Sequence, residues 1–348
     1  MRKTQSYTRY SNDPLLRSIW DYPGRLVAAR GKRIRPYVAY LMYQSLSDGG
    51  EQEDEGALRL LVALELFHLF CLIHDDIIDK GAERYSLPTL HRYVAAELDK
   101  ENRLSDHNCP NHAWRDHAHI GNAQAILLGD MLFAWSQEAF HANRDFSCGT
   151  LHEARGYFSS MIDEVVIGEM LDVDMTTRHM TSREAIYQKM LLKTASYTFI
   201  RPMQIGAALA NRGEQCEAFC HDLGLSLGLA FQIQDDLLDI VGTSKSTRKS
   251  VFSDLREHQH TYFTQYILER GTTAQKSRLR ELMGSDVQPE DRLEVIELFE
   301  SSGALSYGMT SIRRHLSDAY HLLHNAPMRL HDRRPFYKLI ETIQGRSL

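Results

Sequence analysis

Residues 58–79 read LRLLVALELFHLFCLIHDDIID, and this stretch indicates the fold class most clearly. Arg59, Glu65 and His68 interrupt the apolar run, so it does not predict a membrane span. A helix that is apolar on almost every side is buried in a large core. The apolar residues recur all round the helix: Leu61, Val62, Leu64, Phe67, Leu69 and Phe70.

Helical periodicity dominates the rest of the chain. Strands alternate with helices nowhere, which disfavours a parallel α/β sheet. Gly and Pro together are 30 of 348 residues, below the average share of about 12%. No repeat and no linker divides the chain, so we predict one all-α domain over residues 1–348. Further buried helices are expected over 123–139, 159–173, 184–210 and 218–241, and amphipathic helices are expected after residue 271.

Composition excludes several classes of protein. The chain has 40 Lys and Arg against 46 Asp and Glu, with a net charge of −6. This balance argues against a nucleic-acid-binding protein, which usually has a basic excess. The five cysteines are scattered and form no disulfide framework, which is typical of a reducing compartment. The first residues lack the apolar segment of a signal peptide, so we predict a cytoplasmic protein.

Two acidic clusters carry the strongest chemical signal. HDDIID at 74–79 and QDDLLD at 234–239 each follow an apolar helix. Their aspartates are three and four residues apart, which places carboxylates on one helical face. Like charges repel and are costly to desolvate, so an ordinary core has no use for them. Oxygen ligands without His or Cys indicate Mg²⁺, and two copies suggest two platforms around one diphosphate. The alternative is two solvated helix ends that carry acid runs.

Cations flank these clusters. Lys32 and Arg35 lie three residues apart near an expected helix start, and Arg84 follows the first cluster by five residues. Lys193 and Lys249 lie further along the chain. Arg and Lys both bind phosphate, although each alone is more often a surface cation. We consider them candidate phosphate ligands because they flank the acidic clusters.

Two segments read as loops. Residues 97–119 are polar and include Cys109 and His107, His112, His117 and His119. Histidine and cysteine can bind zinc, but their spacing here matches no zinc pattern, so we predict a solvated loop. Residues 242–253 are small, polar and basic, and form the second expected loop.

In combination, these motifs resemble the trans-isoprenyl diphosphate synthases, the family of farnesyl and geranylgeranyl diphosphate synthases. The resemblance covers residues 31–258 and implies an all-α bundle of the isoprenoid synthase type with a central substrate cavity. It rests on ordered motifs: GKRIRP at 31–36, ELFH at 65–68, HDDIID at 74–79, GEMLD at 168–172, KTASY at 193–197 and FQIQDDLLD at 231–239.

The resemblance assigns a role to each matching residue. Isopentenyl diphosphate would be held by Lys32, Arg35 and His68. The allylic diphosphate would be bound by Lys193, Arg84 and Lys249. Catalytic roles fall to Lys193, Thr194, Tyr197 and Gln232. Three Mg²⁺ ions would be held, together with the diphosphate, by Asp75, Asp76, Asp79, Asp235, Asp236 and Asp239.

Several residues depart from the family pattern. Tyr85 follows Arg84 where the family has a second arginine, and Glu169 replaces the glutamine of GQxxD. Ser253 replaces a loop glycine, and His258 stands where a second lysine is usual. These changes suggest weaker diphosphate binding, an altered substrate or a changed reaction.

Aromatic bulk before the first aspartate motif sets product length in this family. Phe70 lies five residues before Asp75, about 7–8 Å along the helix, and Phe67 lies about 12 Å along it. Cys71 between them and the motif is small. A large aromatic at this depth predicts a C15 to C20 product. Alternatively, Phe67 and Phe70 are ordinary core residues.

The resemblance implies that an allylic diphosphate ionises, couples with isopentenyl diphosphate and loses a proton. A class I terpene cyclase on the same fold, which needs no isopentenyl diphosphate, is a second hypothesis. Tyr85 and His258 favour it, whereas Lys32, Arg35 and His68 argue against it. A non-catalytic regulatory subunit is a third, although the six aspartates argue against it. A homodimer without nucleic-acid partners is expected, and Arg346 is a candidate late contact to the diphosphate.

Overall fold

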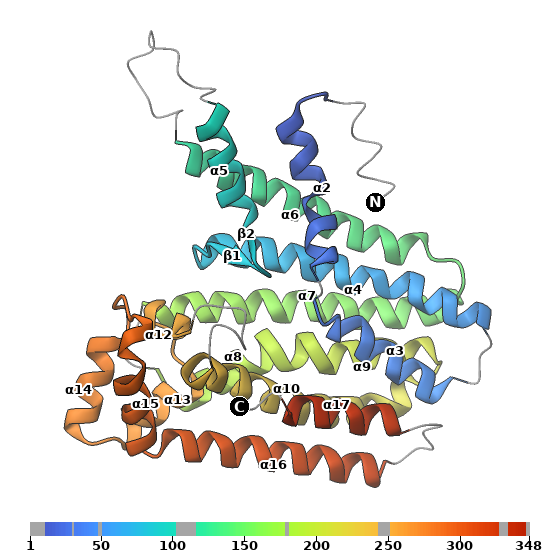
Figure 1. Cartoon of the computed structure of the whole chain (residues 1–348). Coiled ribbons are helices and arrows are strands. Elements are labelled where there is room, and N and C mark those ends of the chain that lie inside the picture. Colours follow the sequence, from blue (N-terminus) through green and yellow to red (C-terminus); the bar gives the residue numbers. More distant parts are fainter. Residues whose placement is uncertain are drawn as a thin grey trace. The chain divides into compact units, whose positions relative to one another are not determined.

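The computed structural model describes residues 11–29, 31–47, 51–101, 116–177, 181–242, 251–326 and 333–345. Over these ranges the chain is mainly helical, with two short strands and connecting loops, and Figure 1 shows helices almost throughout. The prediction of an all-α fold is therefore confirmed. The elements are α2 (Pro14–Ala28), α3 (Ile34–Leu46), α4 (Glu51–Ile78), β1 (Glu83–Arg84), β2 (Leu87–Pro88), α5 (Leu90–Glu101), α6 (His117–Ala142), α7 (Cys148–Thr176), α8 (Arg183–Lys189), η2 (Met190–Ile200), α9 (Arg201–Leu209), α10 (Gly213–Val241), α12 (Ser253–Arg256), α13 (Tyr262–Arg270), α14 (Thr273–Leu282), η3 (Pro289–Asp291), α15 (Arg292–Ser301), α16 (Ala304–His324) and α17 (Arg334–Gln344).

Contacts within the chain group it into two compact units, each with its own apolar core. The first unit comprises Met1–Arg33 and Val62–Ala142, and the second comprises Ile34–Leu61 and Asn143–Leu348. Helix α4 begins in the second unit and ends in the first. The first aspartate cluster therefore belongs to the first unit and the second cluster to the second.

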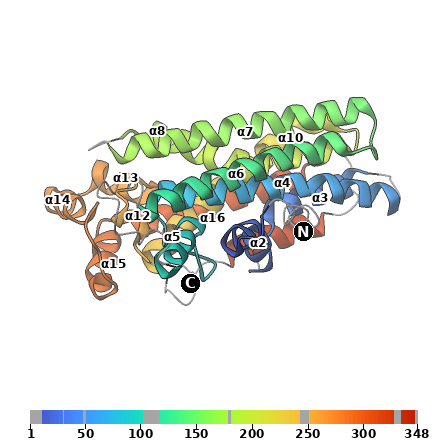
Figure 2. The same cartoon turned by 90° about the horizontal axis from the view of Figure 1, so that it is seen from above.

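The first unit is built around α6, against which α2 and α5 pack (Figure 2). Helices α5 and α6 approach closely at Gly121, where an added Cβ would lie 2.2 Å from the carbonyl oxygen of His91. Only glycine fits this contact. Apolar side chains from α4 and α6, among them Ile73, Leu128 and Leu132, fill the core of the unit. This packing fixes the end of α4 against α6.

The second unit centres on α10, which packs against η2, α9 and α16. Helix α3 lies on α9 at Gly206, where a Cβ would lie 2.1 Å from the carbonyl oxygen of Ala39. Leu223 and Leu227 on one side of α10 are fully buried. Helices α14 to α17 confirm the helices expected after residue 271.

The helix predicted over 184–210 is divided into three pieces. Helix α8 is followed by η2, a π-helix of 11 residues, and then by α9. Each hydrogen bond of a π-helix spans one residue more than in an α-helix, and such turns occur frequently at functional sites. Apolar periodicity does not reveal this change, because the segment is buried on nearly all sides and its pattern fits either helix.

The loop predicted over 97–119 is shorter than expected. Helix α5 continues to Glu101 and α6 begins at His117, so both ends of the predicted loop are helical. Residues 102–115, with His107, His112 and Cys109, lie outside the described residues, as does Lys249 in the second predicted loop.

One described helix is long and apolar enough to cross a membrane. An 18-residue window of α4 reaches a mean hydropathy of 2.0, but 56% of that window is buried inside the protein. The core helix of a soluble protein passes the same test.

Candidate functional site

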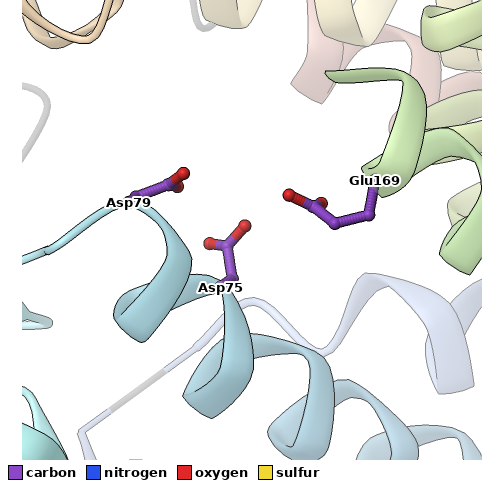
Figure 3. A group of neighbouring side chains, drawn as sticks. All are labelled: Asp75, Asp79 and Glu169. Carbon is purple, nitrogen blue, oxygen red and sulfur yellow. The ribbon is translucent and has the colours of Figure 1, made fainter. Parts of the chain in front are cut away.

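The first aspartate cluster lies at the end of α4. The amide of Asp79 donates to the carbonyl oxygen of Asp75 at 2.8 Å, which extends the helical bonding beyond Ile78. Figure 3 shows the carboxylates of Asp75 and Asp79 close together, with oxygen atoms within 4.8 Å of each other. Both residues are half-buried, whereas Asp76 is only 2% exposed. The cluster therefore has two accessible carboxylates and one that is enclosed.

Arg84 is held against this cluster by a hairpin. Strands β1 and β2 pair antiparallel, with Tyr85 and Ser86 at the tip in the left-handed region, at φ 54° and 62°. Two such residues are what a two-residue type I′ turn requires. Arg84 donates from Nε to Asp76 at 2.6 Å and from Nη2 to Asp75 at 2.8 Å. The hairpin thus delivers one guanidinium to two aspartates.

Burial by itself lowers the pKa of Arg84, but Asp75 and Asp76 outweigh this effect and raise that pKa above its ordinary value. The guanidinium therefore stays charged and reduces the repulsion between the two carboxylates. Binding of a diphosphate by Arg84 stays a prediction.

Tyr85 faces the loop that joins α2 to α3. A Cβ on Gly31 would lie 3.5 Å from the Tyr85 hydroxyl and 2.5 Å from Nη1 of Arg33. Arg33 in turn donates to Glu65 of α4 at 2.6 Å. A larger residue at position 31 would therefore require the Arg33 guanidinium to shift. The neighbouring Lys32 is exposed, as a substrate-binding lysine needs to be.

An aromatic cluster lies before the first aspartate cluster on α4. The ring of Phe70 packs 5.4 Å from Phe67, 5.4 Å from Phe133 of α6 and 4.6 Å from His74, measured between centroids. Phe67 is completely buried, whereas Phe70 is half-buried. Of the two candidate aromatics, Phe70 is therefore the accessible one. His68, a predicted substrate ligand, is half-buried on the same helix.

In the second unit, η2 carries Lys193, Thr194 and Tyr197. A Cβ on Gly168 of α7 would lie 2.6 Å from the backbone nitrogen of Lys193, and one on Gly228 of α10 would lie 2.3 Å from Cα of Ala195. Both helices therefore rest directly on the backbone of η2. This contact fixes the point from which Lys193 projects, and it explains why the GEMLD motif begins with glycine.

Lys193 is bound by two carboxylates of α7. Its Nζ lies 2.6 Å from Asp172 and 2.9 Å from Glu169, the residue that replaces glutamine in the family motif and is drawn in Figure 3. Lys189, at the end of α8, binds the other oxygen of Asp172 at 2.8 Å. Burial raises the pKa of Asp172, but Lys189 and Lys193 outweigh it and hold that pKa below its ordinary value. Asp172 therefore stays ionised.

Thr194 and the second aspartate cluster are joined by a chain of hydrogen bonds. Thr194 donates to Gln232 at 2.5 Å, and Gln232 donates to Asp236 at 2.7 Å. The backbone amide of Tyr262, in the first turn of α13, also donates to Asp236. Burial raises the pKa of Asp236 to about 6, although Gln232 and Lys189 act in the opposite direction. Asp236 is only 6% exposed. It therefore holds Gln232 and the start of α13 in place from within the core of the second unit.

The third aspartate of this cluster caps a helix. Asp239 accepts hydrogen bonds from the amide and hydroxyl of Ser253, at 3.0 and 2.7 Å, and from the amide of Asp254 at 3.1 Å. These donors form the first turn of α12, where orphan amides favour an anionic partner. Asp235 is half-buried, as Asp239 is, and metal binding by this cluster stays a prediction.

Arg35 packs on an aromatic ring of η2. Its guanidinium carbon lies 3.8 Å from the centroid of the Tyr197 ring, well inside the range of a cation–π interaction. Tyr197 is 4% exposed and lies across the contact between α3 and η2. Arg35 is thus one observed partner of Tyr197, and a role of Tyr197 along the path of an allylic cation stays a prediction.

Comparison with known proteins identifies the family. Residues 15–299 match the polyprenyl synthetase family, which is most of the chain. The chain belongs to the polyprenyl synthetase family. It is 31% identical to the short chain isoprenyl diphosphate synthase of Methanocaldococcus jannaschii over 285 residues, covering 82% of this chain and 77% of the relative. The geranylfarnesyl diphosphate synthase of Aeropyrum pernix is 28% identical over 316 residues, covering 87% and 86%.

A solved polyprenyl synthetase shares the fold. The geranylgeranyl pyrophosphate synthase of Corynebacterium glutamicum, in complex with isoprenyl diphosphate and magnesium, superposes with a TM-score of 0.79 at 26% identity. The match covers 93% of this chain and 89% of the other. The predicted family and the isoprenoid synthase fold are therefore confirmed.

Two departures from the polyprenyl synthetase pattern have structural explanations. His258 stands where the resemblance leads us to expect a lysine, and its Nδ1 lies within hydrogen-bonding distance, 2.9 Å, of the carbonyl oxygen of Thr176 at the end of α7. Ser253 contributes its hydroxyl to the cap that Asp239 forms. Both residues therefore tie α12 and its surroundings to the rest of the second unit.

Sequence reasoning missed two residues of the site. Lys189 lies four residues before Lys193, and this spacing could have indicated a second cation near the same carboxylates. Phe133 carries no sequence signal, because its contact with Phe70 depends on the packing of α6 against α4. Lys249 and Arg346 lie outside the described residues.

Replacing Gly168 with Ala is expected to displace η2. The new Cβ would lie within 3.0 Å of three backbone atoms of Leu192 and Lys193, and overpacking of this kind costs about 1–3 kcal/mol. We expect a lower melting temperature together with a higher KM for a diphosphate substrate. The matched control is Gly156→Ala on the same helix, where nothing lies within 4 Å and a gain of about 0.5–1 kcal/mol is expected. Equal melting temperatures and equal KM values for the two variants would contradict the close packing of Gly168 against η2.

Proposed function

We propose that this protein condenses isopentenyl diphosphate with an allylic diphosphate to give a C15 to C20 prenyl diphosphate. The observation that carries the proposal is that each aspartate cluster ends an apolar helix and is ordered by its own cation or helix terminus. Arg84 organises the first cluster, and Gln232, Tyr262 and α12 organise the second. Family membership agrees with this activity.

The aspartate clusters fit Mg²⁺ in their donor chemistry. Asp75 and Asp79 offer oxygen atoms within 4.8 Å of each other without a nitrogen or sulfur ligand in the same group, and hard oxygen donors suit Mg²⁺. We assign these two residues and Asp235 to the metal, with three ions as the proposed number. Bound Mg²⁺ would supply the positive charge that stabilises the departing diphosphate.

The chain's own residues would perform the remaining steps. Lys193 would bind the allylic diphosphate, which requires that it exchange Asp172 and Glu169 for phosphate oxygens. Lys32, Arg35 and His68 would hold isopentenyl diphosphate, with Arg35 oriented by Tyr197. When both substrates are held in the right orientation, their bimolecular coupling becomes an effectively unimolecular step within one complex. Apolar walls such as Phe70 would shield the allylic cation from water.

Product analysis tests the reaction. Purified protein with Mg²⁺ is given C5, C10 or C15 allylic diphosphate, with and without isopentenyl diphosphate. Elongation that depends on isopentenyl diphosphate is the expected result. Hydrocarbon or alcohol from the allylic substrate alone would instead establish a terpene cyclase. Turnover of neither substrate, with altered products from an active synthase, would indicate a regulatory subunit.

A homodimer in the cytoplasm is the proposed assembly. Helix α7 exposes Val166, Ile167, Met170 and Val173 by 43, 49, 67 and 43%, and a stripe of this kind marks an interaction surface. We assign it to a second copy of the chain. Met170→Glu is expected to shift the protein to monomer in light scattering, because it places a charge in the interface. Leu293→Glu, at a residue 82% exposed on α15, is the control and should leave the mass unchanged.

A further inference from the structure

Asp172 of α7 is shared by two lysines, one on each carboxylate oxygen. Lys189 lies 2.8 Å from Oδ1 and Lys193 lies 2.6 Å from Oδ2. The Asp172 side chain is 8% exposed, so its charge is almost entirely removed from water. A buried carboxylate that loses its partner is strongly destabilising. Removing one of the two lysines therefore makes Asp172 depend on the other for a counter-charge.

The two lysines are not equivalent. Lys189 also donates to the carbonyl oxygen of His260 at 2.8 Å, and its side chain is 12% exposed. Lys193 has a second carboxylate partner, Glu169, and its side chain is 26% exposed. Lys189 is thus fixed between α7 and the start of α13, whereas Lys193 is the more accessible ammonium. Of the pair, Lys193 can leave Asp172 with the smaller change in structure.

We propose that Lys189 is a positioning residue that keeps Asp172 neutralised while Lys193 turns to the substrate diphosphate. This inference rests on the proposed function, in which Lys193 binds the allylic diphosphate. Without Lys189, a move by Lys193 would leave Asp172 as an unpaired buried anion. Lys193 would then remain on Asp172, and the diphosphate would lose its ligand. Lys189 acts through Asp172 and does not itself touch the substrate.

The test measures binding of inorganic pyrophosphate in the presence of Mg²⁺ by calorimetry. Lys189→Met keeps the length of the side chain but removes its charge, and should weaken binding about tenfold or more. Lys189→Arg retains a cation and should bind pyrophosphate nearly as the wild type does. Lys276→Met is the control, because Lys276 also donates to a backbone carbonyl, that of Glu269 at 3.1 Å. Its binding should not change.

The decisive comparison repeats Lys189→Met in a protein that already carries Asp172→Asn. If Lys189 acts by neutralising Asp172, then Lys189→Met should have little further effect once Asp172 is uncharged. An equal loss in both backgrounds would overturn the proposal and leave Lys189 a purely structural residue. This comparison also serves if Lys189→Met alone fails to fold, because the double variant buries no unpaired carboxylate.

Kinetics separate this inference from the proposed function. Lys189→Met should raise KM for the allylic diphosphate and leave KM for isopentenyl diphosphate within about twofold. A change in both KM values would count against the inference. If the wild type performs no prenyl transfer, the proposed function fails, whereas the pyrophosphate measurements still decide whether Lys189 and Asp172 are coupled.

Discussion

Replacing Asp235 with Asn is expected to lower kcat by about a hundredfold or more, with little change in melting temperature. Asp235 is half-buried at the end of α10, and its two neighbours in the cluster are occupied elsewhere. Asp236 is enclosed by Gln232 and Tyr262, and Asp239 caps α12. We assign the carboxylate of Asp235 to the metal, and an amide is a poorer ligand.

Asp239→Asn is the matched comparison, because it makes the same chemical change one turn away. The amide keeps an acceptor for Ser253 but loses the negative charge and the oxygen that binds the amide of Asp254. Loss of a helix cap costs about 1 kcal/mol, so a lower melting temperature is expected with a smaller loss of kcat. Thermal unfolding and steady-state kinetics on both variants check this. A hundredfold loss at Asp239 without destabilisation would show that its carboxylate serves the metal.

Replacing Phe70 with Ala is expected to lengthen the product by one or more five-carbon units. Phe70 is half-buried, and its ring lies against Phe67 and Phe133. Removing the ring opens space directly before the first aspartate cluster, where the growing chain would extend. The same change removes buried contacts and should cost about 2–4 kcal/mol of stability. Chromatography of the dephosphorylated products measures chain length.

Two further variants make the chain-length test specific. Phe133→Ala should also lengthen the product, because Phe133 supports Phe70 from α6. Phe140→Ala, at a fully buried residue further along α6, is the control. It should lower the melting temperature and leave product length unchanged. Unaltered products from Phe70→Ala would remove Phe70 as the limit on chain length.

Much of the fold could be predicted from the sequence, since apolar residues recur around long helices in an unmistakable pattern. The pattern predicts a helix over 218–241, and α10 ends at Val241 as expected. It also predicts a helix over 184–210, but it does not indicate the π-helical centre of that segment. A buried segment has similar composition in either helix, because both faces are covered. Only the close approach of Gly168 and Gly228 shows how η2 is held.

Residue type and helical spacing are local properties of the chain, so the all-α fold and the positions of the acidic clusters could be derived before any coordinates, and the ordered motifs showed a resemblance to the family. Tertiary structure decided what each charged group does. It placed Arg84 on Asp75 and Asp76, shared Asp172 between Lys189 and Lys193, and directed Asp239 to α12. The reason is that a buried charge must find a partner, and that partner comes from whichever element packs beside it.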